Sequence, residues 1–152
     1  MQSIEKKAKR LDPVIEERKA RFDNELTQLT IVRKKKIAAV EAMRATQKEY
    51  IDGVSRLNEE RASHNRLMLD ALETGLDNVK SLWMRLYQDV IEIEKMEKEQ
   101  TEVMSRAHRS LEAIQTLQSK YKAEWAHEQL KREQKMLDEH ALRKFYRHTS
   151  GG

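Results

Sequence analysis

Three residue types in this chain could contribute to a chemical site. Histidines could bind a metal ion, carboxylates could act in catalysis, and glycines could form a phosphate-binding loop. No two histidines are three or four residues apart, so a helix would not bring a pair together to bind a metal ion. The four glycines are too few and too scattered to form a phosphate-binding loop, and there is no cysteine nucleophile. The 26 acidic residues are mixed with 30 basic ones, and nothing predicts a cleft that would perturb them. The sequence therefore predicts no catalytic residue, no metal or cofactor site, and a protein that is not an enzyme.

Two aromatic residues, Tyr121 and Trp125, are better candidates for a function, and that function is binding. They lie one helical turn apart in a chain whose aromatic content is only 5%. Tryptophan and tyrosine side chains often contribute most of the binding energy at protein interfaces. Because a regular apolar pattern stops at Trp125, we expect both residues to contact a partner protein. The alternative is that residues 1–12 of the same chain cover them.

The element that must position these aromatic residues is a long helix. Between Leu69 and Trp125, a stripe of mostly apolar residues recurs with alternating spacings of three and four, which is the a/d pattern of a coiled coil. The pattern lasts for roughly eight heptads, more than the three or four that identify a coiled coil. Such a narrow stripe faces a single partner helix. The sequence predicts this helix over about residues 66–146.

The partner helix is predicted nearer the N-terminus, over about residues 13–57. Asp12-Pro13 is typical of an N-cap followed by the first helical residue, and the alternative is a helix from Ser3 that bends at Pro13. Its stripe consists of a sevenfold series and a companion series four residues further on. These are Ile15, Phe22, Leu29, Lys36, Met43, Tyr50 and Leu57, and then Leu26, Arg33, Val40, Gln47 and Val54. Together the helices predict an all-α fold, a single long antiparallel two-helix coiled-coil hairpin over residues 1–152.

The turn of this hairpin is predicted within residues 52–66. Either Asp52-Gly53 ends the first helix, or that helix runs to about Arg61 and residues 62–65 form the turn, with Ser63 or Asn65 as the next N-cap. Counting along antiparallel helices from a turn near residue 60 brings residue 1 level with about residue 119. We therefore expect the C-terminal helix to overhang the first helix. A change in the phase of the apolar residues beyond Trp125 also indicates the end of intramolecular pairing.

Polar residues interrupt both stripes, and such residues can fix the register of a coiled coil at some cost in stability. If the turn lies at residues 62–66, antiparallel counting places Lys36 within about one helical turn of Glu97. We call the line along which the two stripes meet the seam. An unpaired charge in the seam lowers the stability of the coiled coil, whereas a paired charge fixes its register. We expect these two side chains to meet.

The overall charge is only +4, and most of the basic residues are interleaved with acidic ones along the chain. This mixture is typical of a solvated helix surface, whereas nucleic-acid-binding proteins usually gather basic residues on one face. No run of about 18 apolar residues is present, and the N-terminus has no apolar core of a signal peptide. We predict a cytoplasmic protein that does not bind nucleic acid and does not insert directly into a membrane.

Four short segments, together with the predicted hairpin, resemble one family. They are Gln-Lys-Glu-Tyr at 47–50, Ala-Ser-His-Asn-Arg at 62–66, Leu-Glu at 72–73 and Arg-Glu-Gln-Lys-Met-Leu-Asp-Glu at 132–139. They resemble the flagellar type III export stalk protein and its injectisome counterpart, the FliJ/YscO family. Its members are small, charged, cysteine-poor antiparallel hairpins with an overhanging C-terminal helix.

The resemblance implies a non-enzymatic central stalk of a hexameric export ATPase, located in the cytoplasm at the periphery of the membrane export apparatus. The paired termini would enter the ATPase, and some members also handle secretion chaperones. The residues that would contact the ATPase are Tyr121, Trp125, Arg132, Lys135 and Leu137. The turn end would contact the membrane protein of the export gate, for which Tyr50 and Leu72 match the family by identity.

Two other functions fit the residues. The coiled-coil stripe alone would suit a structural scaffold or tether subunit of another large assembly. The basic run at 33–36 and the basic C-terminus would suit a protein that binds nucleic acid or another acidic surface. The residues do not distinguish a flagellar system from a virulence secretion system.

Overall fold

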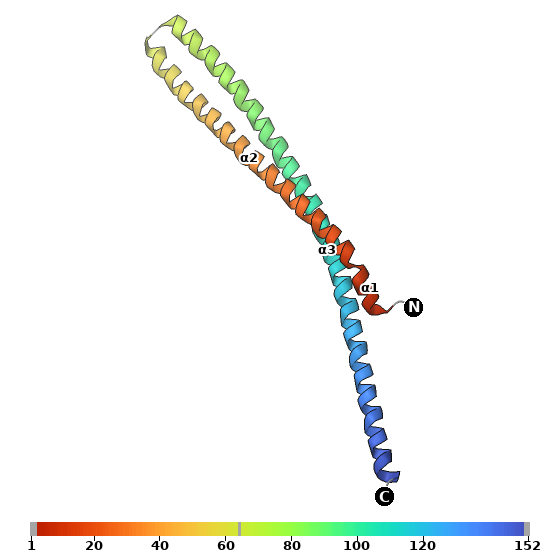
Figure 1. Cartoon of the computed structure of the whole chain (residues 1–152). Coiled ribbons are helices and arrows are strands. Elements are labelled where there is room, and N and C mark those ends of the chain that lie inside the picture. Colours follow the sequence, from red (N-terminus) through yellow and green to blue (C-terminus); the bar gives the residue numbers. More distant parts are fainter. Residues whose placement is uncertain (1–2, 64, 151–152) are drawn as a thin grey trace. The chain divides into compact units, whose positions relative to one another are not determined.

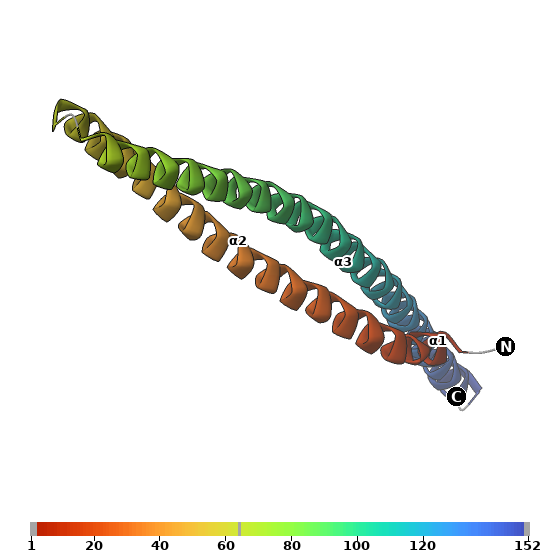
Figure 2. The same cartoon turned by 90° about the horizontal axis from the view of Figure 1, so that it is seen from above.

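The structure is a computed structural model in which residues 3–63 and 65–150 are described (Figure 1). Within these ranges there is no strand, and the elements in order are α1 (Ile4–Arg10), α2 (Asp12–Glu60), the short 3-10 helix η1 (Arg61–Ser63) and α3 (Arg66–Ser150). α2 and α3 lie side by side near the turn in both Figure 1 and Figure 2. The predicted all-α helical hairpin is confirmed.

The chain divides into two compact units. We call residues 1–22 with 106–152 the terminal unit, and residues 23–105 the turn unit. Each unit pairs part of the N-terminal half of the chain with part of α3. The single hairpin domain predicted over residues 1–152 stays a prediction.

A break in the helical hydrogen bonds at Leu11 separates α1 from α2. The amide of Leu11 donates to the carbonyl of Ala8 at 3.2 Å, and its own carbonyl accepts from the amide of Ile15 at 2.8 Å, which opens α2. Pro13 lies in the first turn of α2, where its missing N–H is not needed. The structure thus has a helix on each side of the break, so it combines the two starts that the sequence allows.

The turn lies at the later of the two predicted positions. α2 continues through Gly53, so an end at that glycine is wrong, and the reason is that Gly53 packs against α3. Asn65 acts as the N-cap of α3, because its side-chain oxygen accepts from the amide of Met68 at 3.4 Å. The Ser63 side chain, the other candidate cap, and His64 lie outside the described residues.

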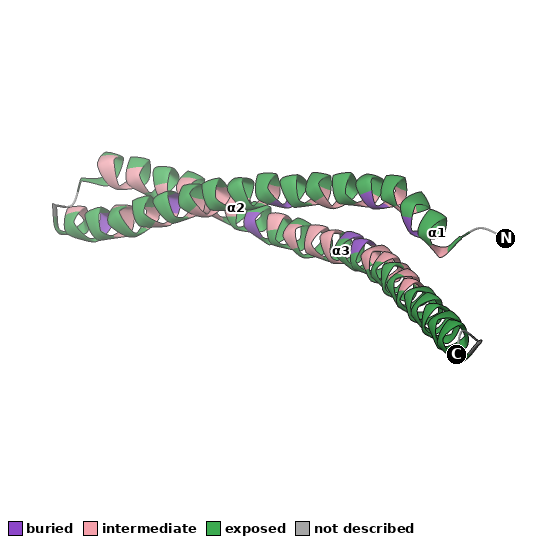
Figure 3. Ribbon diagram, turned by 60° about the horizontal axis from the view of Figure 1, so that its bottom comes forward, coloured by how far each residue is buried: buried purple, intermediate pink, exposed green. Residues whose placement is uncertain are grey.

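The stripe predicted on α3 forms the core of the hairpin. Every position of this stripe between Leu69 and Trp125 is buried or partly buried, and Val90, Ala107 and Leu111 are the most enclosed. In Figure 3 the buried and intermediate positions of α3 form a band along a helix that is otherwise exposed. Narrow burial of this kind is what a two-helix coiled coil produces.

The stripe predicted on α2 is half right. The sevenfold series is enclosed, with Ile15, Leu29 and Leu57 buried. The companion series is wrong at Leu26, which is 42% exposed, and at Arg33, which is also exposed. The other three companion residues, Val40, Gln47 and Val54, are partly buried as predicted. The residues of a further enclosed series lie three positions after the sevenfold series, because the a-to-d step of a coiled coil is three residues. They are Arg18, Glu25, Val32, Ala39, Thr46 and Gly53.

Candidate functional site

Within residues 3–63 and 65–150, no group of three or more histidine, aspartate and glutamate side chains is placed to hold a metal ion. His108 pairs with Glu112 on the same helix at 3.1 Å, and its ring packs against Phe22 with 5.1 Å between ring centroids. No helix in the described part of the chain is long and apolar enough to cross a membrane. The residues that the sequence predicts to bind partners lie on α2 and α3.

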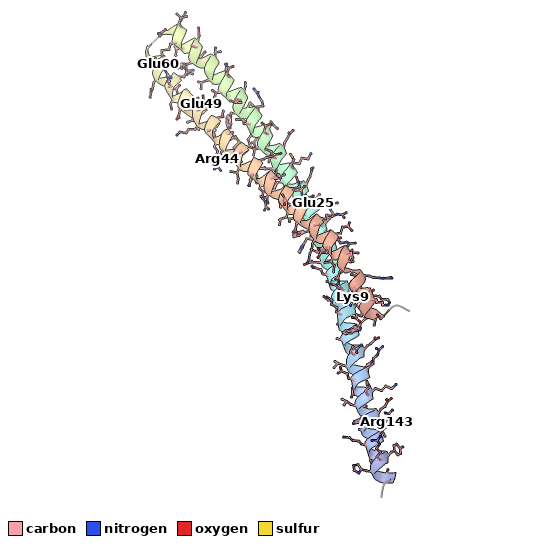
Figure 4. All side chains as sticks on the ribbon, in the orientation of Figure 1. Lys9, Glu25, Arg44, Glu49, Glu60 and Arg143 are labelled. Carbon is pink, nitrogen blue, oxygen red and sulfur yellow. The ribbon has the colours of Figure 1, made fainter. Side chains whose placement is uncertain are left out.

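The last part of α3 is exposed at every position from residue 130 to residue 149, and we call it the C-terminal segment. It includes three of the predicted ATPase contacts, Arg132, Lys135 and Leu137. Basic side chains such as Arg143 extend from it (Figure 4). Its large apolar side chains are 54–69% exposed. They are Leu130, Met136, Leu137, Leu142, Phe145 and Tyr146.

Trp125 does not belong to this exposed segment, although it is a predicted contact. It lies in a groove between α1 and α3 that is also lined by Glu5, Ala8 and Lys122. Trp125 and Tyr121 are both partly buried. The structure therefore separates the five predicted ATPase contacts into two partly covered aromatic residues and three exposed residues, and their roles stay predictions.

The predicted end of pairing near residue 119 is wrong. α1 lies beside Trp125 and Ala126, which is farther along α3 than the counting predicts. The reason is the turn, which lies after residue 60 and moves every pairing partner toward the C-terminus. The alternative, in which the N-terminal part of the chain covers Trp125, agrees better with the described residues, because Glu5, Ala8 and Lys9 line the same groove.

Side-chain hydrogen bonds hold the N-terminal part of the chain on α3 in the terminal unit. The Gln118 side-chain amide donates to the carbonyl of Ala8 at 2.9 Å and to a carboxylate oxygen of Asp12 at 2.6 Å. Arg18 donates to Ser110 twice, to the hydroxyl at 2.8 Å and to the carbonyl at 3.1 Å. These bonds fix both sides of the break between α1 and α2.

In the turn unit, charged and polar side chains meet across the hairpin, and the predicted contact of Lys36 with Glu97 is one of them. Lys36 Nζ lies 3.5 Å from a carboxylate oxygen of Glu97, with the two side chains 35% and 25% exposed. Gln100 donates to the side chain of Glu25 at 2.6 Å and to its carbonyl at 3.1 Å. Figure 4 shows Glu25 beside α3. Because Lys36 is paired in the seam, the basic run at 33–36 does not form one uniform basic face.

The two predicted gate contacts lie in different surroundings near the turn. Tyr50 stacks on Trp83, with 5.9 Å between ring centroids and 25° between ring planes. Leu72 lines a groove that both helices form, together with Gly53 and Gly75, and Tyr50 is not among the residues that line it. The gate role of both residues stays a prediction.

Sequence reasoning missed the two grooves and the hydrogen bonds of Gln118. A signal for the groove near the turn was present, since Gly53 lies seven residues after Thr46 in the seam and a glycine there lets two helices approach closely. Gln118 was visible as a polar seam residue. Its partners could not be read from the sequence, because they depend on the register of the two helices.

One family model, described as the flagellar FliJ protein, matches residues 7–150. The match includes every residue to which the resemblance assigns a role. No curated protein and no solved structure is significantly similar to the chain.

Proposed function

Because the chain belongs to the FliJ family of flagellar proteins, as its sequence predicts, we propose that it is the central stalk of a hexameric export ATPase. Family membership makes it a coiled-coil protein associated with flagellar export. In the proposed role its paired termini enter the ATPase, and its turn end contacts the membrane protein of the export gate. The stalk is not itself an enzyme, works in the cytoplasm at the periphery of the membrane, and also handles export chaperones.

The observation that supports this role is the C-terminal segment. An unbroken helix that exposes six large apolar side chains to water has a strong reason to bind a partner. Basic residues lie among them, including Arg132, Lys135 and Arg143, and all three are exposed. These basic side chains would favour binding to a hexameric ATPase whose inner loops are acidic, because attraction between opposite charges speeds and orients association.

The test is the rate of ATP hydrolysis by the purified export ATPase as the chain is added. The full chain should raise this rate, and a chain lacking residues 130–152 should not. The truncation removes exposed residues, so the melting temperature of the remaining hairpin should change little.

A matched pair of substitutions separates contact from general damage. Leu137 and Leu67 are both exposed leucines of α3, at 69% and 85%, and only Leu137 lies in the C-terminal segment. We expect Leu137→Asp to reduce stimulation of the ATPase and Leu67→Asp to leave it unchanged. Unchanged stimulation after truncation at residue 130 would contradict the stalk role, and a scaffold or tether in another assembly would then be the better explanation.

The gate contact is tested separately, with the cytoplasmic domain of the gate protein as the probe. Leu72→Ala should weaken binding of this domain, because Leu72 lines the groove near the turn. Tyr50→Phe is the matched test of the second residue, since it keeps the stacking on Trp83 and removes only the hydroxyl. Equal binding by Leu72→Ala and the unchanged chain would remove Leu72 from the proposed contact.

A nucleic-acid-binding role is the remaining alternative, and salt dependence tests it. Binding to DNA or RNA that depends on phosphate contacts should weaken by orders of magnitude between about 50 and 200 mM salt. We expect no measurable binding at the lower concentration. Tight, salt-sensitive binding would support this alternative over the stalk.

A further inference from the structure

α1 covers part of the surface that the proposed function assigns to the ATPase. Ala8 is only 4% exposed, and it shares a groove with Trp125, Lys122 and Ala126 of α3. The apolar part of this groove therefore includes Ala8 of α1 and Trp125 of α3. A partner that binds Trp125 must either displace α1 or bind around it.

α1 is held more weakly than the long helices. It has seven residues, and helices this short are not stable in water without tertiary contacts. Ala8 is its one buried residue among those described. The ion pair between Lys9 and Glu5 is highly exposed and adds little. Local opening of α1 should therefore cost far less than unfolding of the hairpin.

The connection to α2 allows such an opening. Leu11 interrupts the helical hydrogen bonds, so α1 can leave α3 without disturbing the rest of α2. Gln118 holds the two sides of this break, because its side-chain amide donates to Ala8 and to Asp12. Both acceptors bind the same NH₂ group, so a change at Gln118 should weaken the attachment on both sides of the break.

We propose that α1 is a detachable strap that covers Trp125 in the free protein and is released when the ATPase binds this surface. The proposal rests on the proposed function, because it names the ATPase as the competitor of α1. The strap lowers the apparent affinity for the ATPase by the fraction of molecules in which Trp125 is covered. The strap would shield the Trp125 side chain from water until the hexameric ATPase binds.

The first test measures the closed state without the ATPase. Gln118→Glu keeps the size of the side chain but removes the donor and places a carboxylate beside Asp12. In a Trp83→Phe background, Trp125 is the single tryptophan. We expect Gln118→Glu to increase quenching of Trp125 by acrylamide and to speed hydrogen exchange of the α1 amides roughly tenfold.

Two controls accompany this variant. Gln28→Glu makes the same change at an exposed position of α2 and should alter neither signal. Adding Asp12→Asn to Gln118→Glu restores a donor opposite the new carboxylate and should return both signals toward those of the unchanged chain. Unaltered quenching and exchange in Gln118→Glu would show that Gln118 does not hold the strap. The role proposed for Gln118 would then be wrong.

The second test asks whether the ATPase requires the strap to open. Cysteines replace Lys9 and Lys122, which line the same groove in a chain that has no other cysteine, and a cleavable cross-linker joins them. We expect the cross-linked chain to stimulate ATP hydrolysis less than the same sample after cleavage. Hydrogen exchange of the α1 amides in the unmodified chain should become faster when the ATPase is added.

The outcomes separate the strap from the stalk role. If the cross-linked and cleaved samples stimulate equally, or if the ATPase slows exchange of α1, the strap proposal is wrong while the stalk role stands. If the unmodified chain gives no stimulation, the stalk role itself fails, and release of α1 by the ATPase fails with it.

Discussion

Replacing Gly53 by alanine tests how closely α2 and α3 approach near the turn. In an ordinary helical position, this change stabilises a protein by about 0.5–1 kcal/mol, because glycine loses more backbone freedom on folding. At Gly53, however, the added Cβ would lie 2.5 Å from Cδ2 of Leu76. Carbon atoms in good contact are about 3.5–4.0 Å apart, so Leu76 must change its rotamer or the helices must separate.

The expected magnitude follows from these two opposing terms. Overpacking of a core contact costs about 1–3 kcal/mol, which offsets the gain in helix propensity. We therefore expect Gly53→Ala to lower the free energy of unfolding by about 0–2 kcal/mol. Gly75 is the matched control, because a Cβ there would meet nothing within 4 Å. Gly75→Ala should stabilise the chain by about 0.5–1 kcal/mol.

The assay is urea denaturation followed by circular dichroism, with thermal melting as a second measurement. For a chain of this size, each kcal/mol should move the melting temperature by about 2–4 °C. Equal stabilisation by both alanines would refute the reasoning, because it would mean that Leu76 turns aside at no cost. Adding Leu76→Ala removes the obstructing methyl groups, so in that background Gly53→Ala should no longer be the worse of the two glycine replacements.

Three further predictions concern the seam and its end. Lys36→Met and Glu97→Met should show a coupling of about 0.5–1.5 kcal/mol in a double-mutant cycle, and additive effects would place the charges apart. Trp125→Ala should lower the free energy of unfolding by about 1–2 kcal/mol, less than for a fully buried tryptophan, and no loss at all would mean that α1 does not pack on the indole. Spin labels at the exposed positions 35 and 95 should report one intrachain distance that survives dilution with unlabelled protein. Loss of that distance on dilution would indicate a dimer.

The α3 stripe and the hairpin were predictable because they depend on periodicity alone. A helix repeats its faces with a fixed period, so leucine, valine and isoleucine at heptad spacing identify the buried side without knowledge of the partner. The contact between Lys36 and Glu97 followed from the same regularity, because both helices rise by equal steps. An approximate turn position was therefore enough to predict contacts in the middle of the hairpin.

The pairing of α1 and the places of Arg18 and Glu25 in the α2 stripe were not predictable in this way. Each residue by which the turn moves shifts the partner of a given position by two residues, so a small error near residue 60 becomes large at the N-terminus. On α2, Arg18 and Glu25 resemble solvent-facing residues in the sequence. They lie in the seam because Ser110 and Gln100 satisfy their hydrogen bonds, and such pairs have no periodic signal.

The same polar pairs indicate how the protein can combine a fixed register with an end that opens. Apolar contacts tolerate sliding, whereas the bonds of Gln118 to Ala8 and Asp12 exist in one register only. Their net contribution is modest, because the groups they join also bind water when the helices part. Such bonds would align α1 in one register and, in the proposed strap, would oppose its release only weakly. If the chain acts as the proposed stalk, polar residues at this end would suit an exchange of α1 for the ATPase, because a seam of leucine residues would hold α1 more tightly.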